Sequence, residues 1–387
     1  MSGLRATLAV LGIAFCGLCL PAQANTTATT VAQAETGAVD LSTTERTVSI
    51  ALLLPLRSAT LREPAEMVRA GFQAAYEREN DGLAINIVET GDAPQDILSG
   101  YNAAVAMSDV VVGPLSRSGV AAVAQAGGVS KPTIALTPPE AAENGEVSVP
   151  PQMLLMGLSI EEEARQVASW AARDAKPGRA LVLFTPTAWQ RRAAKAFETE
   201  WQQKKREAEP LELAANDGFL NGRELLQLKK QIETDKPAVI FLALDARQAR
   251  QVRAVMGKGV PLYGTSQLNP FALSDRAEGE RALDMDGTRL LDIPWQLQPD
   301  HPAVMVYPRL VVAADQKRNA DFERLYALGI DAYRVAREIA ARRSNFEIDG
   351  VTGKLTVRFT QAQFSFARSA QPAVYREGSV IAVGQAR

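Results

Sequence analysis

The chain has 387 residues, 47% of them hydrophobic, and its 42 Lys and Arg against 44 Asp and Glu give a formal net charge of −2. This balance argues against a nucleic-acid partner, because nucleic-acid-binding domains carry a basic face. The length predicts two or three domain-sized units. The chain contains two cysteines, Cys16 and Cys19, and one histidine, His301. Zinc sites usually combine several Cys and His ligands, and two cysteines and one histidine are too few for such a site. We therefore expect neither a metal nor a cofactor.

The first 24 residues have the pattern of a secretory signal peptide. Arg5 provides a positive charge, an apolar stretch follows, and Ala22-Gln23-Ala24 supplies the small residues that a signal peptidase recognises. A lipid anchor needs a small residue before the acylated cysteine, whereas bulky residues precede both Cys16 and Cys19. We therefore expect cleavage after Ala24 and a soluble protein in the periplasm, which is anchored to the outer membrane only if one of these cysteines is lipidated.

Residues 25–46 are rich in Thr and Ala and lack periodicity, so we expect a flexible tether. From residue 47 onward, apolar runs typical of buried strands alternate with amphipathic stretches typical of helices. The expected strands cover residues 48–56, 84–90, 109–115, 132–137, 179–186, 211–215, 238–245 and 261–266. The expected helices cover residues 67–75, 95–107, 119–128 and 189–208, and three more begin at the capping residues Ser159, Asn221 and Asp245.

Alternating strands and helices predict parallel strands joined by right-handed crossovers. The alternation of strands and helices stops over residues 141–153 and then resumes, so the chain contains two successive α/β units. Such units, followed by terminal strands, predict the two-lobed fold of type I periplasmic binding proteins, with a doubly wound parallel sheet in each lobe. Because the chain crosses the hinge of that fold three times, the expected lobes are 47–157 with 264–345 and 158–263 with 346–387.

The last third of the chain is less regular. Residues 265–320 contain one expected strand, at 290–295. A helix from Phe322 to Arg343 has one apolar side and is expected to pack on the first lobe. Two hairpins are expected to follow, with turns at Asp349-Gly350 and Glu377-Gly378.

Motifs of common enzyme classes are absent from the sequence. No G-x-S-x-G elbow, phosphate-binding P-loop or G-x-G-x-x-G turn occurs. A catalytic triad would have to use His301, which lies between Asp300 and Pro302 in an irregular segment, and we interpret it as a solvated loop residue. Asp284 and Asp286 lack the glycine spacing and the final glutamate of a calcium loop, so we expect a turn there. The protein is therefore not expected to be an enzyme.

Hydroxyl side chains occur where strands give way to helices. Ligands of doubly wound sheets bind beyond the carboxyl ends of the strands, and hydroxyls and helix N-terminal amides can hold a carboxylate there. The candidate ligand-binding residues are Ser116 and Ser118 after the third strand, Thr137 after the fourth, and Thr265 and Ser266 after the last strand of the second unit. The alternative is that Ser118 caps its helix, which is worth about 1 kcal/mol. We expect the serines mainly to cap and shape this joint.

Several segments, taken in chain order, resemble one family. They are "IALLLPL", "VRAGFQAAY", "VVGPLSRSGVAAVA", "IALTPP", "LYGTSQLN", "LDIPW" and "RLYALGIDAYRVA" with "FEIDGVTGKLTV". Together they resemble the C-terminal module of the penicillin-binding protein activators, the LppC-type lipoproteins, over residues 47–387. The most specific parts are "LDIPW" and the block from "ALGIDAY" to "GVTGKL".

The resemblance implies a non-enzymatic activator of a class A, bifunctional penicillin-binding protein, which synthesises peptidoglycan. Full-length members carry a helical repeat region before this module, whereas here we expect only the tether. A flexible tether of about 22 residues spans about 25 Å on average. That reach is short for a contact between an outer-membrane anchor and an inner-membrane synthase.

The alternative is a solute-binding protein of an ABC transporter, with an amino acid or another small anion as its ligand. An α-amino acid requires an acidic side chain for its ammonium group in addition to donors for its carboxylate. The candidate residues supply hydroxyls but no unambiguous acid. Arg117 lies between the two serines, so a small anion remains an alternative ligand.

Overall fold

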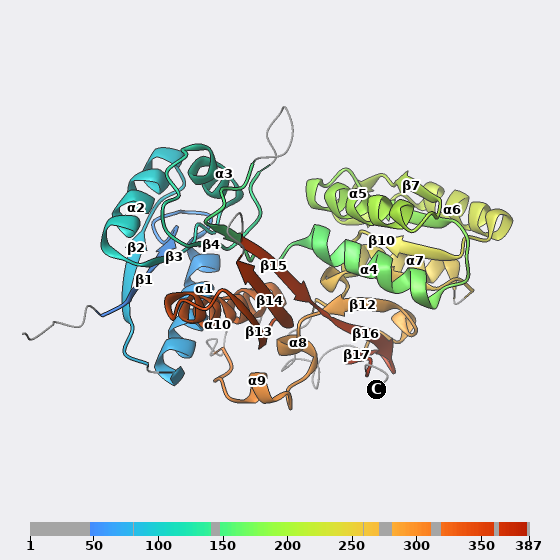
Figure 1. The fold of residues 1–387 in the computed structure, drawn as a ribbon. Helices are drawn as coiled ribbons and strands as arrows, with labels where there is room; N and C mark the ends of the chain where they lie inside the picture. The colour runs from blue at the N-terminus through green and yellow to red at the C-terminus, as the bar shows by residue number, and fades with distance from the viewer. Residues whose placement is uncertain are drawn as a thin grey trace, which may run out of the picture. The chain divides into compact units, whose positions relative to one another are not determined.

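The computed structural model describes residues 47–79, 81–140, 148–257, 259–270, 281–310, 319–359 and 364–384. The expected signal peptide and tether lie outside these residues. Residues Arg46–Arg387 form one compact unit that contains two large sheets and a smaller antiparallel one (Figure 1). No helix of the described part of the chain is long and apolar enough to cross a membrane.

The first sheet has five parallel strands in the order β2-β1-β3-β4-β5. These strands are β1 (Ser49–Leu54), β2 (Ala84–Glu89), β3 (Val110–Val112), β4 (Thr133–Ala135) and β5 (Met153–Leu155). The connecting helices are α1 (Arg62–Glu79), α2 (Pro94–Met107) and α3 (Arg117–Gln125). All residues of β1 are buried, because α1 packs on one face of the sheet and α2 and α3 pack on the other.

The second sheet repeats this strand order in β7-β6-β10-β11-β12 and adds two antiparallel strands, β16 and β17, beside β12. Its strands are β6 (Ala180–Phe184), β7 (Ala208–Glu212), β10 (Val239–Leu242), β11 (Leu262–Gly264), β12 (Arg289–Asp292), β16 (Gln371–Arg376) and β17 (Ser379–Ala382). Its helices are α4 (Ile160–Asp174) and α5 (Ala188–Gln203) on one face, and α6 (Gly222–Asp235) and α7 (Ala246–Met256) on the other. The repeated order confirms the predicted pair of doubly wound units.

The remaining elements flank the two sheets. Helix α10 (Ala320–Ala340) packs along α1, as expected for the helix near Phe322. Both expected hairpins are present, β13–β14 and β16–β17.

The smaller elements are β13 (Asn345–Asp349), β14 (Lys354–Phe359), β15 (Phe364–Ser369), β8 (Ala215–Asn216), β9 (Phe219–Leu220), α8 (Pro294–Leu297), α9 (Pro302–Met305), η1 (Ser266–Leu268) and η3 (Leu283–Met285). Strand β15, which pairs with β14, was not predicted.

Two sequence-based boundaries need correction. Helix α5 ends at Gln203 and not at residue 208, because Lys205 adopts a positive φ of 59° and the Trp201 indole N–H donates to the Glu207 carbonyl. Strand β12 was expected in the first lobe, but it pairs with β11 in the second sheet. The division into 47–157 with 264–345 and 158–263 with 346–387 stays a proposal. It assigns β12 to the first lobe and β13 and β14 to the second, whereas β12 pairs in the second sheet and Ile348, Leu355 and Val357 share a hydrophobic core with β1 and α1.

Helices α1 and α10 cross at two glycines. A Cβ atom at Gly71 would overlap the carbonyl oxygen of Tyr326, and a Cβ atom at Gly329 would overlap the carbonyl oxygen of Val68. The two backbones approach this closely only because neither residue has a side chain. This contact explains the glycine in "ALGIDAY" as a packing requirement.

Asp331, two residues further along α10, holds the loop between β13 and β14. Its fully buried carboxylate accepts hydrogen bonds from the backbone N–H of Val351 at 3.1 Å, and from the N–H and hydroxyl of Thr352 at 2.7 and 2.6 Å. Arg368 on β15 also donates to the Thr352 hydroxyl, at 3.1 Å. The family-specific block "ALGIDAY…GVTGKL" is thus a structural joint between α10 and the antiparallel sheet.

Candidate functional site

Ser116 and Ser118 lie at the joint between β3 and α3. Ser116 is the N-cap of α3, and its hydroxyl oxygen accepts a hydrogen bond from the backbone N–H of Gly119 at 3.1 Å. Ser118 is exposed within the first turn of the helix. The expectation that Ser118 is the cap is wrong, because the helix begins at Arg117, two residues before the apolar pattern starts.

Arg117 connects this joint to the second α/β unit. Its guanidinium lies 3.6 Å from a carboxylate oxygen of Glu161, in the first turn of α4. Glu161 also accepts from Arg192 on α5 at 2.7 Å and from the Ser159 hydroxyl at 3.0 Å. Burial alone would raise the pKa of Glu161, but its own backbone N–H, Arg192 and Ser159 lower it below the usual value. The Arg117 guanidinium beside the candidate serines is therefore already paired with an ionised protein carboxylate, that of Glu161.

The other three candidate residues are placed differently. Thr137 is half-buried two residues after β4. Thr265 is fully buried after β11, and its hydroxyl has no hydrogen-bond partner among the described residues. Ser266 is buried, and its backbone N–H donates to Glu163 at 2.9 Å. Four cavities lined by described residues, at Arg179, Trp170, Asn269 and Pro294, do not include any of the five candidates. These residues therefore stay a proposal.

A buried charged network surrounds the turn that follows β11. Arg324 on α10 donates to both carboxylate oxygens of Asp292, at the end of β12, with distances of 3.0 and 2.7 Å. It also donates to the carbonyl oxygens of Ser266 at 3.1 Å and Asn269 at 2.9 Å. Burial alone would lower the pKa of Arg324, but the charge of Asp292 and the hydrogen bonds to it raise that pKa. The guanidinium thus ties α10 to two strand ends of the second sheet.

Glu163 is a further acidic residue of this network, and it accepts a hydrogen bond from the Ser266 N–H. Burial raises its pKa to about 7, and the charge of Asp292 acts in the same direction. The Ser266 N–H and the charge of Arg324 lower the pKa and only partly offset this effect. Glu163 therefore changes its charge near neutral pH, unlike an ordinary glutamate.

Replacing Glu163 by glutamine should remove a pH dependence of stability. A glutamate whose pKa is raised on folding stabilises the native state fully below the unfolded value of about 4.5, and this contribution is lost as the pH rises through 7. From pH 4.5 to 7.5, we expect the Glu163→Gln variant to gain on the order of 1–3 kcal/mol relative to wild type. Urea unfolding of both proteins across this range is the measurement. A stability difference that does not change with pH would contradict the assignment.

Sequence patterns had singled out none of these buried charges. Asp292 lies in the quoted "LDIPW" segment, but it appeared there only as part of a resemblance. Arg324 lies among the apolar positions of a predicted amphipathic helix. A charged residue within an apolar stripe, or directly after a buried strand, is the signal that could have identified them, because a buried charge needs a partner.

His301 is not the solvated residue that we expected. It is the N-cap of α9, and its Nδ1 accepts from the backbone N–H of Ala303 at 3.2 Å. Its side chain is only 18% exposed, and Nε2 lies 3.5 Å from a carboxylate oxygen of Asp349. We expected a solvated His301 side chain because the short helix that begins at Pro302 has no periodic pattern in the sequence. Among the described residues, no group of three or more His, Cys, Asp or Glu is arranged to hold a metal ion.

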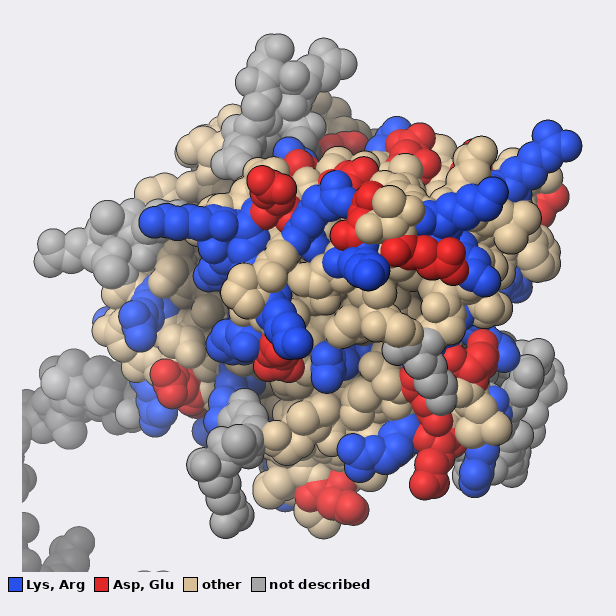
Figure 2. All heavy atoms as spheres, turned by 90° about the vertical axis from the view of Figure 1, so that its right-hand side faces the viewer, with Lys and Arg blue, Asp and Glu red and all other residues tan. Residues whose placement is uncertain are grey.

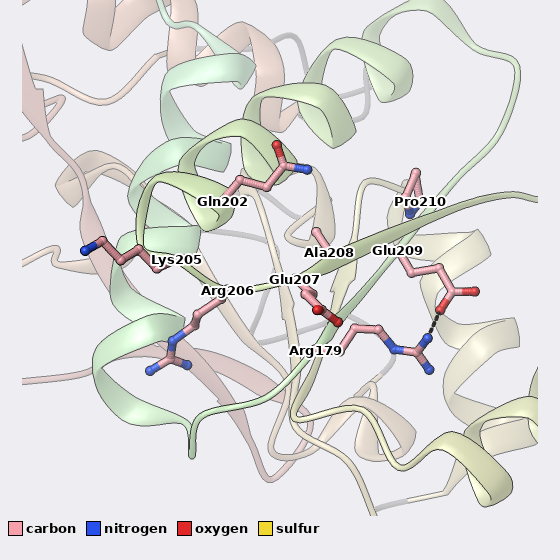
Figure 3. Close-up of a pocket in the computed structure, with 8 residues that line it drawn as sticks. All are labelled: Arg179, Gln202, Lys205, Arg206, Glu207, Ala208, Glu209 and Pro210. Carbon is pink, nitrogen blue, oxygen red and sulfur yellow. Dashed lines mark ion pairs between the residues drawn. The ribbon is translucent and has the colours of Figure 1, made fainter.

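An open pocket of about 580 Å³ lies between the end of α5 and the start of β7 (Figure 3). Arg179 crosses it and pairs with Glu209 at 2.6 Å, while Lys205 and Arg206 point away from that pair. Arg179 also pairs with Asp235 at 2.9 Å. Because its central cation is neutralised by two carboxylates, this pocket is a weak candidate for an anion site.

Solved structures share this fold. A structure described as a putative branched-chain amino acid ABC transporter from Chromobacterium violaceum is 34% identical, with 84% of this chain and 99% of that chain covered and a TM-score of 0.65. The LpoA C-domain from Haemophilus influenzae, described as a regulator of PBP1A, is 20% identical, with 87% and 100% covered and a TM-score of 0.68.

A structure of full-length LpoA from the same organism is 21% identical, with 87% of this chain and 59% of that chain covered and a TM-score of 0.68. The present chain thus spans about three fifths of full-length LpoA. No curated protein matches the chain significantly. The family model described as "LppC putative lipoprotein" matches residues 23–378, which is most of the sequence. The two doubly wound units and this match together show that the chain belongs to the LppC family.

Proposed function

We propose that this protein is a non-enzymatic regulator that activates a class A penicillin-binding protein in peptidoglycan synthesis. Membership of the LppC family supports this proposal. The similarity in fold to the LpoA C-domain, described as a regulator of PBP1A, supports it further. A regulator of this kind acts through its outer surface, so it does not need an open solute site between its two units.

The pairing of Arg117 with Glu161 is the observation that carries the proposal. A solute-binding protein would need the cation and the amides at the β3–α3 joint to meet the carboxylate of a ligand. Here the cation meets a protein carboxylate that is itself held by Arg192. The Ser116 hydroxyl oxygen is likewise engaged by the backbone of its own helix.

The proposal places the protein in the periplasm. Cleavage after Ala24 would give a soluble protein, and acylation of Cys16 or Cys19 would anchor it to the outer membrane. The family description as a lipoprotein supports an envelope location. We retain the unlipidated form as the proposal, because a bulky residue precedes each cysteine.

A solute-binding protein for an amino acid or another small anion is the second candidate. It is favoured by the relative described as a branched-chain amino acid transporter, which is 34% identical to this chain. The buried hydroxyl of Thr265, which has no hydrogen-bond partner among the described residues, also fits a polar ligand near the end of β11. This function would require the Arg117–Glu161 pair to open or to lie beside the ligand.

The double variant Ser116→Gly/Thr137→Ala distinguishes the two functions. Glycine is a tolerated N-cap that costs only a few tenths of a kcal/mol relative to serine. For an activator, we expect stimulation of the purified class A synthase to stay within about twofold of wild type. For a receptor, lost hydrogen bonds to a charged ligand, worth about 1.5–3 kcal/mol each, would reduce affinity at least about tenfold.

Synthase activity and calorimetry against amino acids and small anions are the paired measurements. Micromolar binding of a solute to the wild type that disappears in the double variant would overturn the activator as the primary function. Unchanged stimulation, with no solute bound, would support it.

A further inference from the structure

A groove of about 900 Å³ runs along α4 on the second sheet. One wall is a stripe of helix residues spaced by three and four positions, which therefore share one side of α4. This wall consists of Gln166, Ser169, Trp170, Arg173 and Asp174. The opposite wall takes alternate residues of β12 and β16, which share one face of the sheet. It includes Arg289, Leu291, Pro372, Val374 and Arg376.

No helix of the described residues packs over the groove face of β16. The other face of that strand joins the core through Ala373 and Tyr375, and α8 and η3 lie against β16. On the groove face, Val374 is half-buried and Arg376 is exposed. The sheet thus extends beyond the helices that cover its parallel part, and this leaves one face available for another molecule.

Arg289 is held in a defined position at the base of the groove. Its guanidinium donates to the Tyr263 hydroxyl at 2.8 Å and lies 5.3 Å from the centroid of the same ring. Trp170 packs edge to face on Tyr263 with a centroid distance of 5.4 Å. A guanidinium fixed on an aromatic ring keeps further N–H donors in a planar fork, which matches the geometry of a carboxylate.

The groove has an excess of positive charge. It is lined by Arg173, Arg289 and Arg376 but by a single acid, Asp174. Within the part of the chain that the structure describes, none of the three arginines forms an ion pair. Arg376 lies on the same sheet face as Arg289, because Arg289 pairs with Val374. Neighbouring positions of this kind lie about 7–8 Å apart, so adjacent carboxylates of one chain segment could reach both.

We propose that this groove is the docking surface for an acidic polypeptide segment of a protein partner. Carboxylates of the segment pair with Arg289, Arg173 and Arg376, and its aliphatic atoms lie on Trp170 and Val374. From residue 166 to residue 174, α4 advances about 12 Å, which matches about four residues of an extended chain. An uncovered sheet face suits a polypeptide better than a small molecule, whose sites bury most of the ligand. The identity of the partner as the class A synthase rests on the proposed function.

The test variant is Arg173→Gln/Arg376→Gln in the full mature protein. Both side chains are exposed, so the substitutions remove charge without opening the core. Figure 2 shows many Lys and Arg side chains on the face that lies at the right in Figure 1, so the control must lose the same charge. The matched control is Arg223→Gln/Lys229→Gln on α6, where both residues are also exposed.

Two binding probes allow the docking groove to be tested separately from the proposed function. The first is the purified class A synthase, whose affinity is measured by biolayer interferometry at two salt concentrations. We expect at least tenfold weaker binding and a smaller salt dependence for the test variant, and a change below twofold for the control. The second is acetylated tetraglutamate, titrated while the arginine Nε–Hε signals are followed by NMR. We expect it to shift the signal of Arg289 in the wild type and much less in the test variant.

The outcomes distinguish the two ideas. Wild-type levels of synthase binding by the test variant, together with no shift from tetraglutamate, would overturn the groove and leave the proposed function standing. A tetraglutamate shift that depends on Arg173 and Arg376, without any binding of the synthase, would support the groove and overturn the proposed partner. Equal losses in the test and control variants would overturn the groove, because the effect would then come from overall charge.

Discussion

Replacing Arg324 by methionine should lower the free energy of unfolding by about 3–5 kcal/mol, because it leaves a buried carboxylate without its counter-charge. Asp292 is 1% exposed and Arg324 is 6% exposed. The guanidinium donates to both oxygens of Asp292 and to the carbonyl oxygens of Ser266 and Asn269, so its loss removes these four hydrogen bonds as well as the counter-charge. The Ile293 N–H and the Asn269 amide still donate to Asp292, but they do not neutralise its charge. Chemical denaturation followed by tryptophan fluorescence and circular dichroism measures the change.

Two further variants show whether the charge pair is the cause. Arg324→Met/Asp292→Asn removes both charges and keeps an oxygen for the backbone N–H of Ile293, which donates to Asp292 at 2.8 Å. We expect it to recover at least half of the lost stability. Arg165→Met breaks an exposed pair with Glu162 on α4 and should cost less than about 1 kcal/mol. If Arg324→Met proved as mild as Arg165→Met, the network would not stabilise the fold.

Replacing Gly329 by alanine should cost about 3 kcal/mol, although alanine is intrinsically the better helix former by about 1 kcal/mol. The new methyl group would overlap the Val68 carbonyl oxygen and lie 2.8 Å from the backbone nitrogen of Phe72. Both atoms belong to the backbone of α1, so the two helices would have to separate. Thermal unfolding monitored by circular dichroism measures the effect.

Gly222→Ala is the matched control for this substitution. Gly222 is also helical, but nothing lies within 4 Å of a Cβ atom built there. We expect no loss of stability in this variant. Similar losses for Gly222→Ala and Gly329→Ala would show that the α1–α10 contact adapts to a methyl group and that its closeness is not a requirement.

Local patterns predicted the regular elements well. The continuous apolar runs at β1, β6 and β10 are buried on both faces, because parallel sheets are covered on each side. The caps at Ser159, Asn221 and Asp245 were identified correctly because a capping side chain bonds to an amide two or three residues away. Elements with weak or irregular patterns, such as β15 and α9, were missed.

The candidate site was predicted only in part. The sequence placed hydroxyls at strand ends, and Ser116 and Thr265 do lie at such ends. It could not show that the Ser116 hydroxyl caps α3, that Arg117 meets Glu161, or that the buried Thr265 hydroxyl has no hydrogen-bond partner in the described part of the chain. These facts depend on segments that the chain brings together from distant positions.

By itself, the sequence determined the class of fold and the family, because both depend on the spacing of apolar residues and on short quoted segments. Tertiary structure alone decided which charges are buried and which are free. Arg324 and Arg376 look alike in the sequence, yet the first is enclosed by Asp292 and the second lines an open groove without an ion pair in the described residues. Burial and pairing are set by residues far apart in the chain, and no local spacing encodes those distances.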